Sequence, residues 1–384
     1  MTERLYYLDS HLFEFEAVVT ACEARGDGFL TALDRTAFFP EGGGQSADTG
    51  YIGSVRVTDA HERDGVVWHS TAAPLVPGSA VSCRVDGEQR LRRMQDHSGE
   101  HIVSGIVHGL YGYDNVGFHM GEECMTIDFS GELTAEQLAD VERRANEAVR
   151  ANVPVRAFFP DSAALAAMEY RSKLELTRDV RIVEIEGIDR CACCAPHVSR
   201  TGEVGIIKIL DSMRHRGGVR VSLICGMDAL DDYRARQRSV TEISNLLSAR
   251  RGEVSSAVGR LAEEQQRLKE KCAQLGRELV GYIAASHAPT DGNICVFEDR
   301  LDAVSLRELV NALAEKCRIA AAFTGSDADG YRYIISSRSV DLRPLTRTIN
   351  AGIGGRGGGS GEMIQGSASK NAETIQEFVA SMFV

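Results

Sequence analysis

Two pairs of metal-binding residue types, each spaced by four positions, constrain this chain more than any other feature of its sequence. His97 and His101 form the first pair, and Cys193 and His197 repeat the spacing much further along. On a helix, side chains at i and i+4 share one face, so His97 and His101 can reach one ion. Three imidazole nitrogens and one thiolate make a tetrahedral set suited to zinc. The sequence therefore predicts one Zn²⁺ per chain, and a fold that brings two distant segments together.

Two details of this constellation stay open at the level of sequence. The run CACC offers neighbouring thiols, and the spacing to His197 favours Cys193 over Cys194. The first pair also spells H-x-x-E-H, the inverted zinc-protease motif, in which Glu100 would be the general base. A metalloprotease leaves the CACCAPH segment without a role, so it is the weaker interpretation. Glu100 is then a candidate either to orient a ligand histidine or to act as a base.

Composition narrows the class of protein. The 384 residues suggest two or three domains, and 43% hydrophobic residues suffice for packed cores. No apolar run approaches the roughly 18–20 residues of a membrane helix, and the N-terminus lacks a secretory signal, so we expect no membrane association and a cytoplasmic location. A formal net charge of -12 excludes an indiscriminate polycation. Any RNA contact must therefore be a local basic patch.

The hydrophobic patterns predict an α+β fold in four parts. Residues 1–90 read as short strands of a small β-barrel, and 91–226 as a zinc-binding α/β domain with a helix ending at Gly112. Residues 227–283 read as a helical or coiled-coil segment, and 284–384 as an α/β domain with a glycine-rich loop.

Apolar residues spaced by seven mark the helical segment. Gly252 and Gly259 are candidate breaks in it, and we expect any homodimer to form through residues 227–384. The heptad positions are Val240, Leu247, Val254, Leu261, Leu268 and Leu275.

Four blocks, in order, resemble the trans-acting alanyl-tRNA editing proteins of the AlaX family in their long form. These proteins are related to the editing domain of alanyl-tRNA synthetase. The remainder of the chain resembles, more weakly, the C-terminal domain that these synthetases share with DHH-type phosphoesterases. The four blocks are TAFFPEGGGQSADTG (36–50), RMQDHSGEHI (93–102), DRCACCAPHVSRTGEVGIIKI (189–209) and GGVRVSLICG (217–226).

The resemblance implies a zinc-dependent hydrolase that deacylates alanine tRNA carrying the wrong amino acid, serine or glycine. A pocket built for alanine cannot strongly reject serine, so a second site that recognises the hydroxyl is needed. Thr36 resembles the family threonine beside the substrate pocket. Gln45 follows a glycine turn that includes Gly43 and Gly44, which let the backbone approach a ligand closely. The alternative is a non-catalytic tRNA- or nucleotide-binding module with structural zinc.

Further expectations concern the nucleic acid. Arginines that flank the motif blocks are candidates for phosphate contacts near the tRNA acceptor end. Kinship with a synthetase also suggests ATP binding, although no motif supports it, and the GxGxxG match at 352–357 is an accident of a glycine run. The candidate arginines are Arg92, Arg93, Arg214, Arg216 and Arg220.

Overall fold

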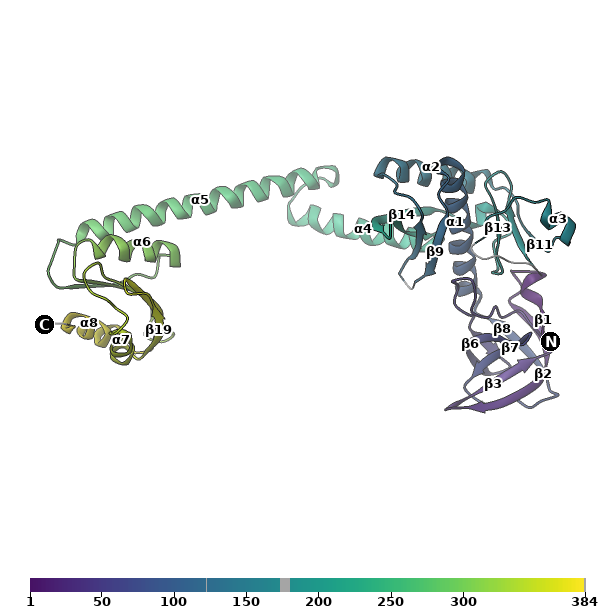
Figure 1. Cartoon of the computed structure of the whole chain (residues 1–384), viewed down its shortest axis with the longest axis horizontal. Helices are drawn as coiled ribbons and strands as arrows, with labels where there is room; N and C mark the ends of the chain where they lie inside the picture. The colour runs from purple at the N-terminus through teal and green to yellow at the C-terminus, as the bar shows by residue number, and fades with distance from the viewer. Residues whose placement is uncertain (122, 173–179, 383–384) are drawn as a thin grey trace. The chain divides into compact units, whose positions relative to one another are not determined.

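A computed structural model describes residues 1–121, 123–172 and 180–382 (Figure 1). The chain divides into two compact units, Met1–Ser239 and Val240–Val384, and each is described by itself. The fold is a mixed α+β fold, as predicted, while the finer four-part division stays a prediction. Among the described residues, no helix has both the length and the apolar character needed to cross a membrane.

The first unit begins with a closed six-stranded barrel. Its strands follow the order β2-β3-β7-β6-β5-β8, and every neighbouring pair is antiparallel. Alternation in β2 turns Phe15, Ala17 and Val19 inward, where they fill the interior. A short parallel pair, β1 (Glu3–Arg4) and β4 (Arg35–Thr36), accompanies the barrel. The barrel strands are β2 (Glu14–Arg25), β3 (Gly28–Leu33), β5 (Gly50–Ile52), β6 (Val55–Arg63), β7 (Val66–Thr71) and β8 (Ala80–Val85).

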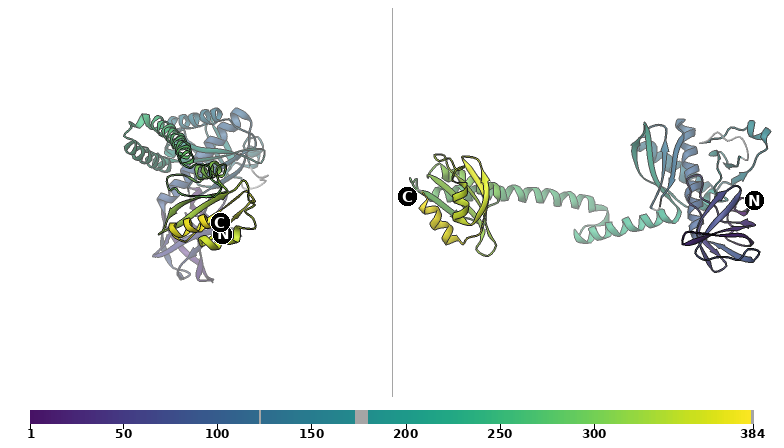
Figure 2. Two further views of the ribbon diagram at one scale, coloured as in Figure 1. Left: turned by 90° about the vertical axis from the view of Figure 1, so that its left-hand side faces the viewer. Right: turned by 60° about the horizontal axis from the view of Figure 1, so that its bottom comes forward.

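Helix α1 (Gly87–Tyr111) runs from the barrel towards helix α2 (Ala135–Ala151), as Figures 1 and 2 show. It ends at Gly112, which has φ 68° and caps the helix, so the predicted stop is confirmed. Both helices share a hydrophobic core with a four-stranded sheet of order β14-β15-β10-β9. A three-stranded sheet, β11-β12-β13, lies on another side of α1. The strands are β9 (Asn115–Met120), β10 (Met125–Phe129), β11 (Val155–Phe158), β12 (Ile182–Ile185), β13 (Asp189–Ala192), β14 (Ile207–His215) and β15 (Gly218–Cys225), and a short helix α3 (Ser162–Ala166) follows β11.

Two glycines inside α1 mark places where the helix touches strands without room for a side chain. A Cβ at Gly99 would lie 2.4 Å from Sγ of Cys225 on β15. A Cβ at Gly105 would lie 2.5 Å from the carbonyl oxygen of Ile188, just before β13. Glycine costs about 1 kcal/mol in a helix relative to alanine. Here that cost is offset by close packing, which brings α1 against both sheets.

The heptad segment forms two helices, α4 (Gly226–Leu246) and α5 (Val254–Ser286). The break falls around Gly252, whereas Gly259 lies inside α5, so only the first of the two predicted breaks is present.

The second unit contains a five-stranded sheet of order β16-β17-β18-β20-β19. Residues of α5 and α6 pack on one face, and residues of α7 and α8 pack on the other. Its elements are β16 (Asn293–Phe297), α6 (Ala303–Ala314), β17 (Ile319–Ser326), β18 (Gly330–Ser336), α7 (Thr346–Ile353), β19 (Gly355–Gly359), β20 (Met363–Ala368) and α8 (Ala372–Ser381).

The glycine run of this unit was expected to form a loop, and that prediction is wrong. Residues Gly355–Gly359 form the edge strand β19, paired with β20. A Cβ at Gly357 would lie 2.4 Å from the hydroxyl of Tyr333. The missing side chains therefore let the strand lie close to the sheet, although glycine has a poor strand propensity.

We predict that Gly105→Ala lowers the free energy of unfolding by at least about 1 kcal/mol, because the clash with a backbone carbonyl outweighs the gain in helix propensity. Gly109→Ala, on the same helix but with nothing within 4 Å of its Cβ position, should instead stabilise the protein slightly. Urea denaturation measures both. Equal effects of the two substitutions would contradict the packing argument.

Candidate metal centre

Four side chains predicted as ligands meet at one point in the first unit. The ligand atoms of His97, His101, Cys193 and His197 all lie within 4.8 Å of one another. The Cys193 thiol lies 3.5 Å from Nε2 of His97 and 3.3 Å from Nε2 of His197. Usual Zn–N and Zn–S bond lengths in a tetrahedron place N and S about 3.5 Å apart. The cluster therefore has the dimensions of a site for one metal ion.

Each imidazole in this cluster is held through its other ring nitrogen. Nδ1 of His97 lies 3.0 Å from Oε1 of Gln45, and Nδ1 of His101 lies 2.9 Å from Oδ2 of Asp189. Nδ1 of His197 lies 3.0 Å from the Ser98 hydroxyl. Because the amide and carboxylate oxygens only accept, Nδ1 carries the proton in His97 and His101. Their Nε2 atoms are then left as the nitrogens that can bind a metal.

The electrostatics of the cluster favour a thiolate at Cys193. Burial lowers the pKa of His101, but attraction by Glu100 and the hydrogen bond to Asp189 outweigh it and hold this pKa well above its usual value. Burial raises the pKa of Cys193, but attraction by His97 and His197 and hydrogen bonds from histidines outweigh it, so the pKa lies well below its usual value. Burial lowers the pKa of His197 to about 3, so this ring is neutral at physiological pH. A thiolate with three imidazole nitrogens is a donor set that zinc prefers.

Arg181 shapes the loop that carries Cys193. Its guanidinium donates to the carbonyl oxygens of Cys193 at 3.0 Å and Ala195 at 2.8 Å. It also lies 5.0 Å from the centre of the Tyr7 ring. These contacts bend the chain between the two ligands of the second pair, a role that no sequence pattern indicated.

The structure distinguishes Cys193 from Cys194 as the candidate ligand, a choice that the sequence left open. Cys193 belongs to the cluster, whereas the exposed Cys194 does not. The Sγ atom of Cys194 lies 3.6 Å from the Cβ position of Gly43, so this thiol faces the glycine turn instead.

A second group of potential ligand atoms shares His101 with this cluster and adds Asp189 and Cys191. Arg171 already donates to both carboxylate oxygens of Asp189, at 2.7 and 2.9 Å. Burial raises the pKa of Asp189, but hydrogen bonds from His101 and Arg171 outweigh it and hold the pKa below its usual value. Asp189 is therefore an ionised anchor for His101, and the four-residue cluster is the better metal site.

The glycine turn delivers Gln45 to His97. Gly42 and Gln45 exchange two backbone hydrogen bonds, each 3.0 Å long. Gly43 and Gly44 both have positive φ, 62° and 85°, as a two-residue type I′ turn requires. Gln45 itself is 1% exposed, and its Nε2 has no hydrogen-bond partner among the described residues. The turn thus places a buried, unsatisfied amide donor beside a candidate ligand.

A buried ion pair fixes this turn to α1. Arg90 donates to Asp48 and to the carbonyl oxygen of Ser10, and both charged side chains are almost completely buried. Asp48 also accepts the backbone N–H of Phe39 at 2.6 Å. Removing one partner of such a pair typically costs about 3–5 kcal/mol. No sequence pattern indicated this role of Arg90, since an arginine at a helix start usually points to solvent.

Glu100 lies within reach of the cluster and is 3% exposed. Its Oε1 accepts hydrogen bonds from the Ser104 hydroxyl at 2.7 Å and from the Asn115 amide. Its Oε2 lies 3.7 Å from Nε2 of His101, the nitrogen that faces the cluster. Glu100 therefore points towards the cluster rather than to solvent.

Thr36 lies in a different environment from the four clustered side chains. It is completely buried, and its hydroxyl lies 2.9 Å from Nε2 of His69. Nδ1 of His69 lies 3.0 Å from the carbonyl oxygen of Thr31, so Nδ1–H donates there and Nε2 accepts from Thr36. The backbone N–H of Phe38 donates to the same threonine oxygen at 3.1 Å. The Thr36 hydroxyl therefore already donates its proton to a side chain of the protein.

The predicted phosphate-contact arginines are not equivalent. Arg92 and Arg220 form ion pairs with Asp228 and Asp128, and Arg93 donates to the carbonyl oxygen of Ala47 at 2.6 Å. Arg214 and Arg216 are exposed, at and beside the turn between β14 and β15, and Arg214 lies 3.3 Å from Glu132. Arg92 is exposed as well, but Asp228 holds its guanidinium group.

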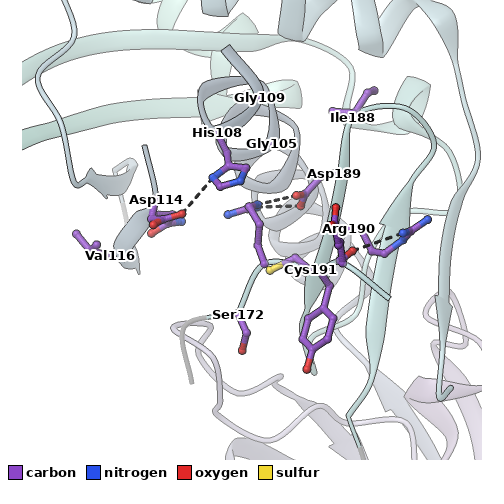
Figure 3. A pocket seen from close by; sticks show the side chains of 14 residues that line it. Gly105, His108, Gly109, Asp114, Val116, Ser172, Ile188, Asp189, Arg190 and Cys191 are labelled. Atoms are coloured by element: carbon purple, nitrogen blue, oxygen red, sulfur yellow. Dashed lines mark hydrogen bonds and ion pairs between the residues drawn. The ribbon is translucent and has the colours of Figure 1, made fainter. Parts of the chain in front are cut away.

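A cavity of about 850 Å³ adjoins the cluster without including it. Figure 3 shows Asp189 and Cys191 on one side of the cavity, and His108 and Asp114 on another. Asp189 also contacts His101, so it separates the cavity from the cluster. None of the four clustered side chains lines the cavity.

We predict that Ser98→Ala lowers zinc affinity by about 10- to 100-fold, because His197 loses the partner of its Nδ1. Ser104→Ala is the matched control, since Ser104 is equally buried on the same helix but bonds Glu100. Competition with a chromophoric chelator measures both affinities. Unchanged affinity in Ser98→Ala would show that this hydrogen bond does not orient the ligand.

We also predict a stability change with pH that belongs to His69. Burial lowers its pKa to about 4, whereas the unfolded chain has the usual value near 6.5. Between these values the unfolded state binds more protons, so stability is complete above about pH 6.5 and falls on acidification. From pH 7 to pH 5 the wild type should lose about 2 kcal/mol more than His69→Gln. Urea titrations give this difference, and His61→Gln, which removes an exposed barrel histidine, should behave like the wild type.

Comparison with known proteins agrees with this architecture. Three family models match: threonyl and alanyl tRNA synthetase second additional domain (180–221), tRNA synthetases class II (A) (10–89) and DHHA1 domain (291–383).

Similar curated proteins are alanine–tRNA ligases. The ligase of Ignicoccus hospitalis is 31% identical over 99% of this chain and 43% of its own length. Those of Halobacterium salinarum and Methanopyrus kandleri are 33% and 30% identical, over 87% and 98% of this chain and 38% and 44% of their own lengths. The chain thus spans less than half the length of these relatives. It belongs to the AlaX-like proteins, the family homologous to this part of the alanine–tRNA ligases.

Proposed function

We propose that this protein is a zinc-dependent hydrolase that deacylates alanine tRNA carrying serine or glycine. The observation that carries the proposal is the buried cluster of three imidazoles and one thiolate, with each imidazole held through Nδ1. The similarity to alanine–tRNA ligases supplies the substrate class. A bound zinc ion would supply Lewis acidity, and would lower the pKa of a bound water to about 7.

Glu100 is the side chain placed to move a proton. Two hydrogen bonds hold its Oε1, while Oε2 faces the side of the cluster where His101 presents Nε2. A fixed carboxylate in this position can accept a proton from a nucleophilic water and return it to the leaving hydroxyl of the tRNA. A general base of this kind contributes about 10²- to 10⁴-fold to a rate.

Gln45 is the stronger of the two candidates for substrate recognition. Its Oε1 orients His97, which leaves Nε2 as a buried donor without a partner among the described residues. An unsatisfied buried donor costs about 1–3 kcal/mol, so it favours a ligand that brings an acceptor oxygen. Thr36 has no proton left for a substrate hydroxyl, although its oxygen can still accept. Arg214 and Arg216 are the arginines that we propose for phosphate contacts.

A second candidate function follows from the saturated ligand set. Four protein ligands are typical of structural zinc sites, whereas catalytic sites usually keep a position open. The chain would then be a tRNA-binding module in which zinc only stabilises the fold. A metalloprotease is less favoured, because Cys193 and His197 would occupy positions that a protease needs for water and substrate.

Deacylation of serine- and glycine-charged alanine tRNA, with alanine-charged tRNA as control, tests the proposal. We expect zinc-loaded wild type to hydrolyse the mischarged substrates, and His97→Ala to lose both zinc and activity. Glu100→Gln should keep zinc and lose about 10²- to 10⁴-fold in rate. Glu88→Gln, on the exposed first turn of α1, should retain full activity.

The outcomes separate the candidates. Wild type that holds one zinc per chain and leaves both mischarged tRNAs intact would refute the hydrolase and favour the structural role. Full activity in Glu100→Gln would exclude Glu100 as the general base without contradicting the hydrolase proposal. Peptide hydrolysis that is lost in Glu100→Gln would instead support the protease.

A further inference from the structure

An exposed aromatic pair lies beside the loop that carries Cys193 and His197, and no role proposed above involves it. Phe159 directly follows strand β11, and its exposed fraction is 52%. Its ring centre lies 5.5 Å from that of Tyr7, and the two ring planes are inclined by 70°. Edge-to-face contact of this kind is favourable for two aromatic rings. Tyr7 therefore supports Phe159 from one side, while much of the Phe159 ring stays open to solvent.

Tyr7 connects this pair to the metal centre. Its ring centre lies 5.0 Å from the guanidinium carbon of Arg181, which donates to the carbonyl oxygens of Cys193 and Ala195. Tyr7 and Cys193 also pack against the same small buried cluster. A short chain of contacts thus fixes the place of Phe159 relative to the loop that carries the ligands.

The backbone at Phe159 is constrained as well. Pro160 follows it, and a residue before proline favours an extended conformation. Asp161 then caps the short helix α3, because its carboxylate accepts the backbone N–H groups of Ala163 and Ala164 at 3.0 and 2.8 Å. Phe159 is therefore held at the surface by its neighbours along the chain as well as by Tyr7.

Exposed residues join the glycine turn to the aromatic pair. Cys194 is exposed, and its Sγ atom lies 3.6 Å from the Cβ position of Gly43. Burial raises the pKa of Tyr7, and the nearby Cys194 adds to the rise, so the thiol lies close to the phenol. Gly43 belongs to the turn that delivers Gln45 to the cluster. Cys194 thus connects the surface beside the metal centre with the surface at Tyr7.

We propose that Phe159 stacks the terminal adenine of the tRNA acceptor end, with Tyr7 as its positioning residue. The inference rests on the proposed function, because that reaction supplies the ligand. The ester to be cleaved joins the amino acid to the ribose of the terminal nucleotide, so the base on that ribose stays close to the metal centre during cleavage. Stacking of a base on an aromatic ring strengthens binding by about 5- to 150-fold.

The size of the exposed surface favours a base over a protein partner. A stable protein interface needs about 800 Å² of surface from each partner. One half-exposed phenyl ring supplies far less, whereas the flat face of a single base needs only one ring. Continuity with the metal centre through Cys194 also favours a part of the substrate itself.

Binding of a non-hydrolysable RNA hairpin to the full-length, zinc-loaded protein tests the proposal. The hairpin has the acceptor-stem sequence of alanine tRNA, and serine is joined to its terminal ribose through an amide. A second hairpin lacks only the terminal base. Wild type should bind the complete hairpin about 5- to 150-fold more tightly than the abasic one. Phe159→Leu should lose this difference, whereas Phe159→Trp, which restores an aromatic face, should keep it.

Tyr51→Leu is the matched control. Tyr51 lies on barrel strand β5 and, like Tyr7, has guanidinium groups beside its ring, those of Arg56 at 5.0 Å and Arg84 at 5.4 Å. Its removal should leave the dependence on the terminal base unchanged. Tyr7→Leu should reduce that dependence, and Tyr7→Phe, which keeps the supporting ring, should restore it.

The stacking site is overturned if wild type binds both hairpins equally or binds neither. It is also overturned if Tyr51→Leu reduces the dependence on the base as much as Phe159→Leu does. Hydrolysis of serine-charged alanine tRNA, measured on the same sample, tests the deacylase separately. Hydrolysis without base-dependent binding would remove the stacking site alone, and base-dependent binding without hydrolysis would support the stacking site and contradict the deacylase.

Discussion

Close packing of helix α1 against two sheets is the constraint on which the first unit depends. At Gly99 and Gly105 the helix leaves no room for a side chain, so the positions of β13 and β15 are tied to the helix axis. Asp189 at the start of β13 is thereby brought to Nδ1 of His101. At the other end of the helix, the buried pair of Arg90 and Asp48 fixes the glycine turn. Helix α1 therefore positions both Asp189 and the glycine turn around the metal centre.

Fixed partners, rather than the four ligand residues alone, give the cluster its chemistry. A buried imidazole can turn or change its protonated nitrogen unless its second nitrogen is held. Gln45, Asp189 and Ser98 hold one ring each, from a turn, a strand and the same helix that carries two of the ligands. The same geometry leaves the amide nitrogen of Gln45 without a hydrogen-bond partner among the residues that the structure describes. Orientation of the ligand and recognition of a substrate thus depend on one side chain in our proposal.

The sequence predicted elements well where a local rule applied. Gly112 ends α1 as predicted, because capping depends on neighbouring residues. The rules failed where glycine had a distant partner. Gly105 lies inside α1 although glycine disfavours helices, and the glycine run suggested a loop, yet both permit a close approach that is only visible in the folded chain.

The sequence by itself determined the donor set, since the i,i+4 spacings and residue types already name three imidazoles and one thiolate. It also determined the order of the elements through their hydrophobic periods. Only the tertiary structure decided which residues hold those ligands. Asp189 lies 88 residues from His101, and Gln45 lies 52 residues from His97. The tertiary structure likewise showed that the Thr36 hydroxyl donates to His69 and that Arg93 donates to the carbonyl oxygen of Ala47. A local pattern encodes spacing along a helix or strand, but contacts across the core depend on how separate elements pack.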